Sequence, residues 1–450
     1  MPLSEFPLPS EDSSGNEPPE IRVLPPGPLS RSALARLEKV ECPAFGHRRH
    51  ARAEAAGADM APIVLTSGRG SNLYDADGNR YVDLAAGFGS VLLGHGATAV
   101  SRAMEAQSDR LVQALGDVNP ADTKLALLER LTSLHPGESP KVLLGTSGSD
   151  AVTAAIKTAV LATGRPGVVA FEGGYHGLGY APLAACGLRE SLRAPFAAQL
   201  NPHVAFAPYP RNSADADRAL SLVEAAVRGK EVGAVLVEPI LGRGGCVVPP
   251  DGFLPALCEV AHRHGALVVA DEIWTGIGRS GAMVRSVAVN APVDVICLGK
   301  GLGGGLPISA CIAPEAIMNA WASGDVIHTS THSGLPLACA AAIGTLDSVR
   351  FRHLAPRAAE VGARAREALS AELGGRRGVV EVRGAGLMLG IELESGELAS
   401  RATRGMLERG YVLLTGGTRG EVLTLTPALT IDEALLSASA GALREVLASG

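Results

Sequence analysis

The sequence predicts an α/β protein in which a mostly parallel sheet is covered by helices on both faces, with a smaller α+β domain beside it. Between about residues 100 and 345, apolar runs of strand length alternate with helical stretches. The runs are apolar throughout, as in strands buried on both faces. Polar residues gather where three of the runs end. The predicted strands are Val142 to Leu144, Gly167 to Phe171, Ala234 to Val237, Ala266 to Ala270, Val293 to Leu298 and Ser309 to Ile312.

The two ends of the chain are expected to form separate parts. Residues 1–29 are rich in Pro, Ser and acidic residues and bury too little apolar surface to order themselves, which predicts a disordered tail or one draped over a partner subunit. Residues 30–95, with a hairpin turn signal at residues 77–79, are predicted to be the N-terminal segment of the small domain. Residues 96–340 would form the large domain. Residues 341–450 would complete the small one.

The composition argues against several classes of function. A chain of 450 residues with 46% hydrophobic content can bury a large core. Its formal charge of -6, without a basic block, argues against nucleic acid as a partner. Seven scattered cysteines without metal-ligand spacing predict a reducing compartment and no metal site. Without a signal-like N-terminus or an apolar run of about 18 residues, the protein is expected to be cytoplasmic and without a membrane span.

Lys300 is one of only six lysines and lies in a glycine-rich segment, residues 299–305, after the predicted strand Val293 to Leu298. Glycines let the backbone approach a flat ligand, and a desolvated amine has a lowered pKa that suits it to imine formation. Taken alone, the segment fits a phosphate-binding lysine or a surface charge better than an imine-forming lysine. The motifs on neighbouring strands favour the imine.

Two carboxylates follow neighbouring apolar runs. Asp271 comes directly after the run 267–270, and Glu238 after the run 235–237. A carboxylate such as Asp271 can keep the proton on a pyridinium nitrogen, so that the ring accepts electrons from a carbanion. In isolation Asp271 also fits a helix cap or a buried ion pair.

Small residues precede a predicted helix at residues 151–162. Gly148 and Ser149 would present N–H groups and a hydroxyl to an anion, and the helix dipole favours a phosphate there. A plain helix cap fits this segment as well. Tyr175 and His176 follow the strand that ends at Phe171, and Tyr175 offers either a stacking face or a core aromatic side chain.

In chain order, these motifs resemble the signatures of the class III (omega-type) aminotransferases, which depend on pyridoxal 5'-phosphate. The resemblance extends from about residue 60 to 431, and motifs that are weak singly are specific in register. It implies fold type I, with a seven-stranded sheet in the large domain. The matching segments are Ser147-Gly148-Ser149, Tyr175-His176-Gly177, Glu238-Pro239, Asp271-Glu272-Ile273 with Thr275-Gly276 and Gly278-Arg279-Ser280-Gly281, Gly299-Lys300-Gly301, and Thr331 before Gly334 and Pro336.

The resemblance implies a role for each catalytic and ring-binding position. Lys300 would hold pyridoxal 5'-phosphate as a Schiff base and later move the proton between the substrate and cofactor carbons. Asp271 would pair with the ring nitrogen. Tyr175 would stack on one face of the ring, and Ile273 would pack on the other.

The resemblance also implies the phosphate ligands. These would be Gly148 and Ser149, joined by Thr331 from the neighbouring subunit. A homodimer with shared active sites, or a tetramer that contains such dimers, is therefore expected. His176 and Glu238 belong to the same cofactor-binding motifs.

The substrate positions depart from the family pattern. Thr424 stands where many relatives carry a carboxylate-binding arginine, and Arg243 stands where they carry the glutamate that pairs with it. The paired change predicts that Arg243 binds a substrate carboxylate or polar tail. An Arg243 that faces solvent, with a carboxylate-free amine as substrate, is the alternative. Trp274 and Phe88 predict an apolar pocket, although such residues are often simply buried.

The expected activity is transfer of an amino group from an amine or amino acid to a 2-oxo acid. Because the arginine is missing, a racemase or epimerase of amino acids, or a related aminomutase, stays open. A nicotinamide oxidoreductase matches only GxGxxG at residues 276–281, and Asp294 begins a strand that the ribose-binding acid should end. Lys300, Asp271 and Tyr175 together argue against a non-catalytic cofactor-binding protein or scaffold.

Overall fold

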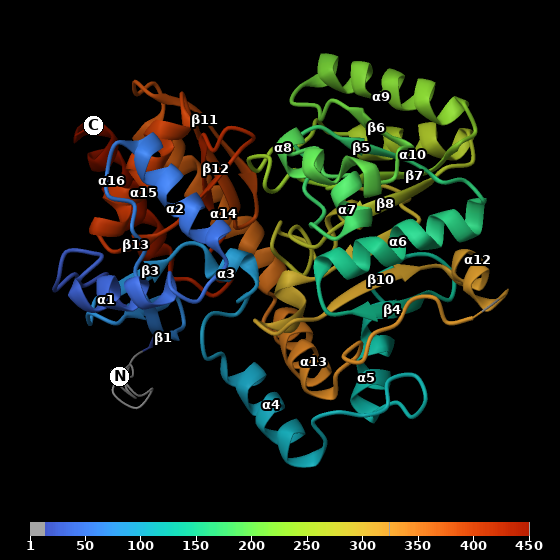
Figure 1. The fold of residues 1–450 in the computed structure, drawn as a ribbon, viewed down its shortest axis with the longest axis horizontal. Helices are drawn as coiled ribbons and strands as arrows, with labels where there is room; N and C mark the ends of the chain where they lie inside the picture. Colours follow the sequence, from blue (N-terminus) through green and yellow to red (C-terminus); the bar gives the residue numbers. More distant parts are fainter. Residues whose placement is uncertain (1–13, 324, 450) are drawn as a thin grey trace.

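A seven-stranded sheet forms the centre of the larger lobe in the computed structural model, which describes residues 14–323 and 325–449 (Figure 1). Strands β5 to β9 run parallel, and β10 is antiparallel to both of its neighbours, β9 and β4. The predicted mostly parallel seven-stranded sheet is confirmed. In spatial order the strands are β4 (Lys141–Gly145), β10 (Ser309–Ala313), β9 (Val295–Leu298), β8 (Leu267–Asp271), β7 (Val232–Val237), β5 (Gly167–Phe171) and β6 (Val204–Ala207).

Both faces of this sheet are buried, because successive side chains of a strand point to opposite sides. In β5, Val168 and Ala170 pack in one cluster with α6 (Gly148–Thr163). Val169 and Phe171 pack in the opposite cluster with α9 (Ser213–Arg228) and α10 (Phe253–Arg263). The continuous apolar runs therefore follow from helices on both faces.

A second helical layer covers the lower end of the large lobe in Figure 1. Helix α13 (Pro336–Phe351) packs against α4 (Thr98–Arg110) and α5 (Asp122–Thr132). Its alanines approach neighbouring helices closely, and Pro336 begins it, as expected for a residue that lacks a backbone donor. The shorter helices are α3 (Ala86–Gly89), α7 (Tyr180–Ala184), α8 (Glu190–Arg193), α11 (Arg285–Ala288) and α12 (Glu315–Met318).

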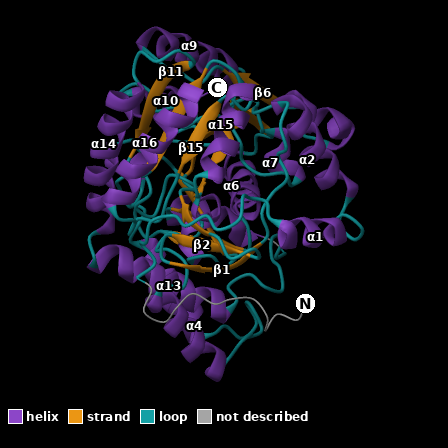
Figure 2. Cartoon of the chain, turned by 90° about the vertical axis from the view of Figure 1, so that its left-hand side faces the viewer, coloured by secondary structure: helices purple, strands orange, loops and turns teal. Residues whose placement is uncertain are grey.

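The smaller lobe combines the two ends of the chain (Figures 1 and 2). Strand β13 pairs in parallel with β3, so a C-terminal strand completes an N-terminal sheet. The predicted hairpin at residues 77–79 joins β2 and β3. One sheet contains β1 (Leu65–Arg69), β2 (Asn72–Asp75), β3 (Arg80–Asp83) and β13 (Tyr411–Val412); the other contains β11 (Val379–Ala385), β12 (Met388–Leu393), β15 (Val422–Leu425) and β14 (Leu414–Gly416). The helices are α14 (Leu354–Leu373), α15 (Gly396–Glu408) and α16 (Glu433–Ser449).

Residues 14–29, expected to be disordered or draped over a partner subunit, are ordered against their own chain. The backbone N–H of Glu17 donates to Asn72 Oδ1 at 2.9 Å, and Glu20 pairs with Arg80 beside β3. Buried asparagine side chains of the hairpin thus bind a segment that has few apolar groups of its own. Helices α1 (Pro28–Leu37) and α2 (Pro43–Ala56) follow, and α2 packs on α15. The rest of the expected tail, residues 1–13, lies outside the described residues.

Within the described part of the chain, the structure contains no helix with the length and apolar character needed to cross a membrane.

Candidate active site

Three neighbouring strands deliver the predicted charged residues to one edge of the large sheet. Glu238 follows β7, Asp271 ends β8, and Lys300 follows β9, and these strands are adjacent and parallel. Their carboxyl ends therefore meet, which is where ligands bind in open α/β sheets. The structure brings together the three residues that the sequence predicted.

The amine of Lys300 lies 4.0 Å from the centroid of the Trp274 ring. Burial lowers its pKa to about 8 from 10.5, against the opposing charges of Glu238 and Asp271. The backbone at Lys300 has φ of +40°, a left-handed conformation that is uncommon outside glycine and clusters at functional sites. A neutral amine in this setting is a nucleophile near neutral pH.

Asp271 and His176 form a buried pair. Nδ1 of His176 lies 2.7 Å from Asp271 Oδ2, and Asp271 Oδ1 accepts from the backbone N–H of Ile273 at 3.1 Å. Burial disfavours the imidazolium, but the hydrogen bond to Asp271 and its charge outweigh that and raise the pKa of His176. These contacts fix the orientation of the Asp271 carboxylate, while Nε2 of His176 has no hydrogen-bond partner among the described residues.

Glu238 joins two loops beside Lys300 through hydrogen bonds to their backbone. One carboxylate oxygen accepts from the backbone N–H of Tyr175 at 2.8 Å, and the other from that of Gly242 at 2.9 Å. Burial raises the pKa of this carboxyl above its usual value. Glu238 thus fixes the loop of the predicted stacking residue relative to the loop that carries Arg243.

The N-terminus of α6 forms a small-residue cradle. Ser147 and Asp150 make a reciprocal capping box, and the first-turn N–H groups of the helix have no partner within it. A Cβ on Gly148 would lie 2.8 Å from the Ile273 side chain, and one on Gly177 would lie 2.8 Å from Ser149 Cβ. This close packing leaves backbone N–H groups and the Ser149 hydroxyl to bind an anion.

Ile273 and Tyr175 lie on elements that enclose the space beside Lys300. Ile273 contacts both the start of α6 at Gly148 and the backbone at Gly299. Tyr175 is half-buried, and the guanidinium of Arg243 lies 5.0 Å from its ring centroid. The third predicted phosphate contact, Thr331, is exposed on its own chain, where its carbonyl accepts from Gln113 Nε2 at 2.9 Å.

All four predicted substrate residues line one cavity of about 60 Å³. Trp274 is buried in its wall, Phe88 is exposed at 55%, and Arg243 and Thr424 complete the group. Two further arginines of this cavity, Arg48 and Arg52 of α2, were absent from the predicted site. Their four-residue spacing on a helix was the one available signal, since it puts both side chains on one face.

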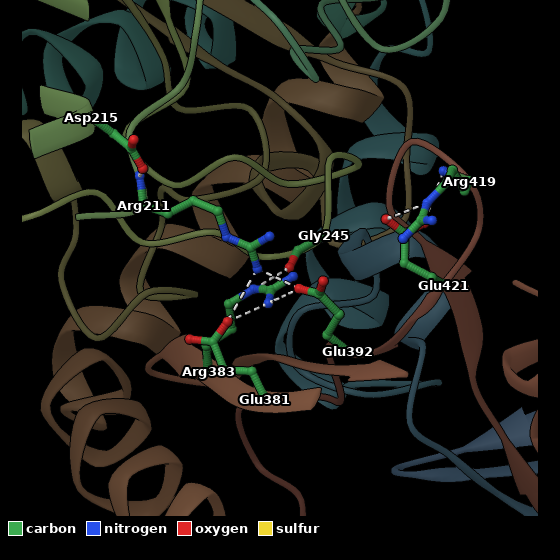
Figure 3. A network of polar contacts seen from close by, with 8 residues as sticks. All are labelled: Arg211, Asp215, Gly245, Glu381, Arg383, Glu392, Arg419 and Glu421. Carbon is green, nitrogen blue, oxygen red and sulfur yellow. Dashed lines mark hydrogen bonds and ion pairs between the residues drawn. The ribbon is translucent and has the colours of Figure 1, made fainter. Parts of the chain in front are cut away.

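A polar network holds the loop of Arg243 in place (Figure 3). The buried Arg383 donates to the carbonyl of Gly245 at 2.8 Å and to Glu381 at 2.7 Å, and it also pairs with Glu392. Arg211 of the large lobe pairs with the same two glutamates of the small lobe. The loop of Arg243 is therefore tied to both lobes.

The segment with the GxGxxG pattern, residues 276–281, forms a buried turn between the lobes. Arg279 is 1% exposed and donates to the carbonyls of Leu387 at 2.9 Å and Pro427 at 2.5 Å. The acid weighed as a ribose ligand, Asp294, accepts instead from Val268 N–H at 2.7 Å. This turn serves the packing of the two lobes.

The donor set fits pyridoxal phosphate: a desolvated amine at Lys300, a buried carboxylate at Asp271 and an open helix N-terminus at α6. Comparison with known proteins agrees. Residues 53–447 match the family model of the class III aminotransferases.

Individual relatives and solved structures cover most of the chain. Acetylornithine aminotransferase of Methanopyrus kandleri is 38% identical over 86% of this chain and 95% of its own. Alanine/serine racemase of Pyrococcus horikoshii is 31% identical over 96% and 93%. The PLP-bound amine transaminase of an uncultivated Pseudomonas species superposes with a TM-score of 0.80 at 31% identity, over 86% and 95%. The chain therefore belongs to the class III aminotransferases, which are pyridoxal-phosphate-dependent enzymes.

Proposed function

We propose that this enzyme moves an amino group from an amine or amino acid to a 2-oxo acid, with Lys300 as the proton-transferring base. The observation that carries the proposal is the lowered pKa of the Lys300 amine, about 8, close to the carboxylates at the ends of β7 and β8. When bound, pyridoxal phosphate supplies an electron-accepting ring that makes the amine-bearing carbon acidic. The neutral form of Nζ, which the lowered pKa makes more accessible, can then take the proton from that carbon and deliver it elsewhere.

Asp271 and His176 would hold the ring in its electron-accepting form. The ionised Asp271 would keep a proton on the ring nitrogen, and His176 would stabilise that charge through its 2.7 Å contact. Ile273, between Gly148 and Gly299, would cover one face of the ring, and Tyr175 the other.

The cradle at α6 would bind the phosphate through Gly148 and Ser149. Thr331 would join them from a second copy of the chain, which makes a homodimer the proposed assembly. Its exposure supports this role, because an exposed threonine is available to a neighbouring subunit. The seven described cysteines are unpaired, which supports a reducing compartment, and we place the enzyme in the cytoplasm.

Racemisation is the second candidate function. Thr424 stands in place of a carboxylate-binding arginine, and a relative of similar length is an alanine/serine racemase. Racemisation returns the proton to the same carbon on the opposite face, whereas transamination delivers it to the cofactor. The two reactions therefore differ in the atom that receives the proton, and this difference can be measured.

The test is the visible spectrum of the holoenzyme with a panel of amines and amino acids, in the absence of any oxo acid. Transamination predicts conversion of the cofactor band to that of its amine form, and the oxo product appears in equal amount. Loss of optical activity without band conversion would replace the proposal with racemisation. The variant Lys300→Ala is the control, because it lacks the proton carrier but keeps the phosphate cradle.

A further inference from the structure

Three arginines from distant parts of the sequence converge at the mouth of the active site. Arg48 and Arg52 lie one turn apart on α2, and Arg243 lies on the loop after β7. All three line the 60 Å³ cavity beside Trp274 and also an adjoining cavity of about 440 Å³. Arg48 and Arg52 precede residues 53–447, the region matched by the family model.

No carboxylate of the described residues forms an ion pair with any of the three arginines. Arg52 Nη2 donates to Thr415 Oγ1 at 3.2 Å, and the Arg243 guanidinium lies over the Tyr175 ring. By contrast, Arg49 on the same helix pairs with Glu41. Desolvation in the cavity, with the charges of Arg48 and Arg243, lowers the pKa of Arg52. Three positive charges held this close repel one another unless an anion joins them.

The surroundings set the position of that anion relative to the chemistry. Trp274 lies against the Lys300 amine and also lines the arginine cavity, so this cavity adjoins the reacting amine. Phe88 adds apolar surface to the same wall. The outer cavity has room for a group larger than one carboxylate. Arg189 and Arg419 also line it, together with one acidic residue, Glu397, which pairs with Arg401.

We propose that Arg48, Arg52 and Arg243 bind the distal end of the substrate, and that this end carries two or more negative charges, as in a phosphate ester or paired carboxylates. The inference rests on the proposed aminotransferase function and adds the substrate class. Guanidinium groups suit this role because each can donate two parallel hydrogen bonds to a carboxylate or phosphate. The N-terminal helix α2 thus becomes a specificity element.

The first experiment measures binding without turnover. Calorimetry on the holoenzyme gives dissociation constants for inorganic phosphate and for glutarate. The double variant Arg48→Ala/Arg52→Ala is expected to weaken at least one of them by tenfold or more, and the anion affected identifies phosphate or carboxylate as the natural group. Arg49→Ala, on the same helix, is the matched control and should bind like the wild type. Equal affinities in the wild type and the double variant would refute the site.

The second experiment measures specificity in the amine half-reaction. The readout is the ratio of kcat/KM for 3-aminopropyl phosphate, or for γ-carboxy-L-glutamate, whose side chain ends in two carboxylates, to that for butylamine. This ratio should fall about a hundredfold in the double variant, and a general folding defect cancels from it. An unchanged ratio contradicts the proposal. If the wild type converts no amine at all, the aminotransferase function fails, while calorimetry still reports on the arginine site.

Discussion

At the scale of single residues, the site combines a desolvated amine, Lys300, with a buried carboxylate, Asp271, that has a partner of its own. Lys300 lies near Asp271 and Glu238, yet burial keeps its pKa low, because the two carboxylates only partly offset the loss of water. Asp271 has its own partner in His176, and the proposed role of this carboxylate is to pair with the ring nitrogen. Burial thus makes the neutral form of the Lys300 amine more accessible than it would be in water.

The buried amine makes the stability of the cofactor-free protein depend on pH. The folded pKa of about 8 lies below the unfolded value of 10.5, so the unfolded chain binds more protons between these values. The contribution of the Lys300 amine to the free energy of unfolding is therefore lowest below pH 8 and rises towards pH 10.5. The variant Lys300→Met should be more stable than the wild type at pH 7, by up to about 3 kcal/mol.

The measurement is the urea midpoint of both cofactor-free proteins from pH 7 to 10. The advantage of Lys300→Met should shrink across that range, whereas Lys39→Met, at an exposed lysine, should show no such trend. A constant difference would mean that the Lys300 amine is already solvated.

Replacing Asp271 with Asn tests the charge and preserves the shape. An amide cannot keep the ring nitrogen protonated, so kcat should fall by about 10²-fold or more, as is typical when a charge aimed at the reacting centre is removed. Asp347→Asn, in an ion pair with Arg130 away from the site, is the control. Steady-state kinetics with cofactor content measured in parallel would exclude simple loss of cofactor; a kcat close to wild type would contradict the assigned role.

At the scale of elements, the start of α6 and the loop after β5 must approach each other closely. Gly177 has φ of +110°, and a Cβ there would lie 2.8 Å from that of Ser149. An alanine at this position would both strain the backbone and displace the hydroxyl that we assign to the phosphate. The local geometry therefore couples a turn residue to cofactor affinity.

We expect Gly177→Ala to weaken cofactor binding by tenfold or more, measured by fluorescence titration of the cofactor-free protein. Gly164→Ala, at the other end of α6, is the control. Gly164 also has positive φ, at +68°, but a Cβ there meets nothing within 4 Å. It should cost about 1 kcal/mol of stability and leave cofactor affinity unchanged. Equal effects of both variants on cofactor affinity would contradict the cradle.

At the scale of the whole molecule, the active site lies where the two lobes meet, and a charged network joins them (Figure 3). The side chains of Arg383 and Glu392 are 8% and 11% exposed, while that of Arg211 is 46% exposed. Burial works against the ionised form of Glu392, but hydrogen bonds from Arg211 and Arg383 lower its pKa below the usual 4.5.

Breaking the buried part of the network should cost much more than breaking the exposed part. Arg383→Met leaves Glu392 poorly paired and should destabilise the protein by about 3 kcal/mol, whereas Arg211→Ala should cost less than about 1 kcal/mol. Because the pKa of Glu392 is lowered, its contribution is present above pH 4.5 and is lost as pH falls below it. Urea unfolding of both variants at pH 7 and pH 4 tests this order, and similar losses at pH 7 would contradict it.

The sequence by itself determined the strands of the large sheet and the residues at their carboxyl ends. Apolar runs and the polar residues that follow them are local features, so Lys300, Asp271 and Glu238 could be placed at one edge of the sheet. The short edge strand β6 was missed, because its four residues give too weak a pattern. The positions of Phe88, Trp274 and Thr424 followed from motif order and proved to share one cavity.

Only the tertiary structure decided how distant segments meet. Residues 14–29, poor in apolar groups, fold onto the hairpin because asparagine side chains of β2 and of the hairpin turn satisfy their backbone, which composition cannot reveal. The meeting of Arg48 and Arg52 with Arg243 depends on the packing of α2 against α15. Such long-range contacts depend on the arrangement of whole elements, whereas sequence patterns report only the surroundings of each residue along the chain.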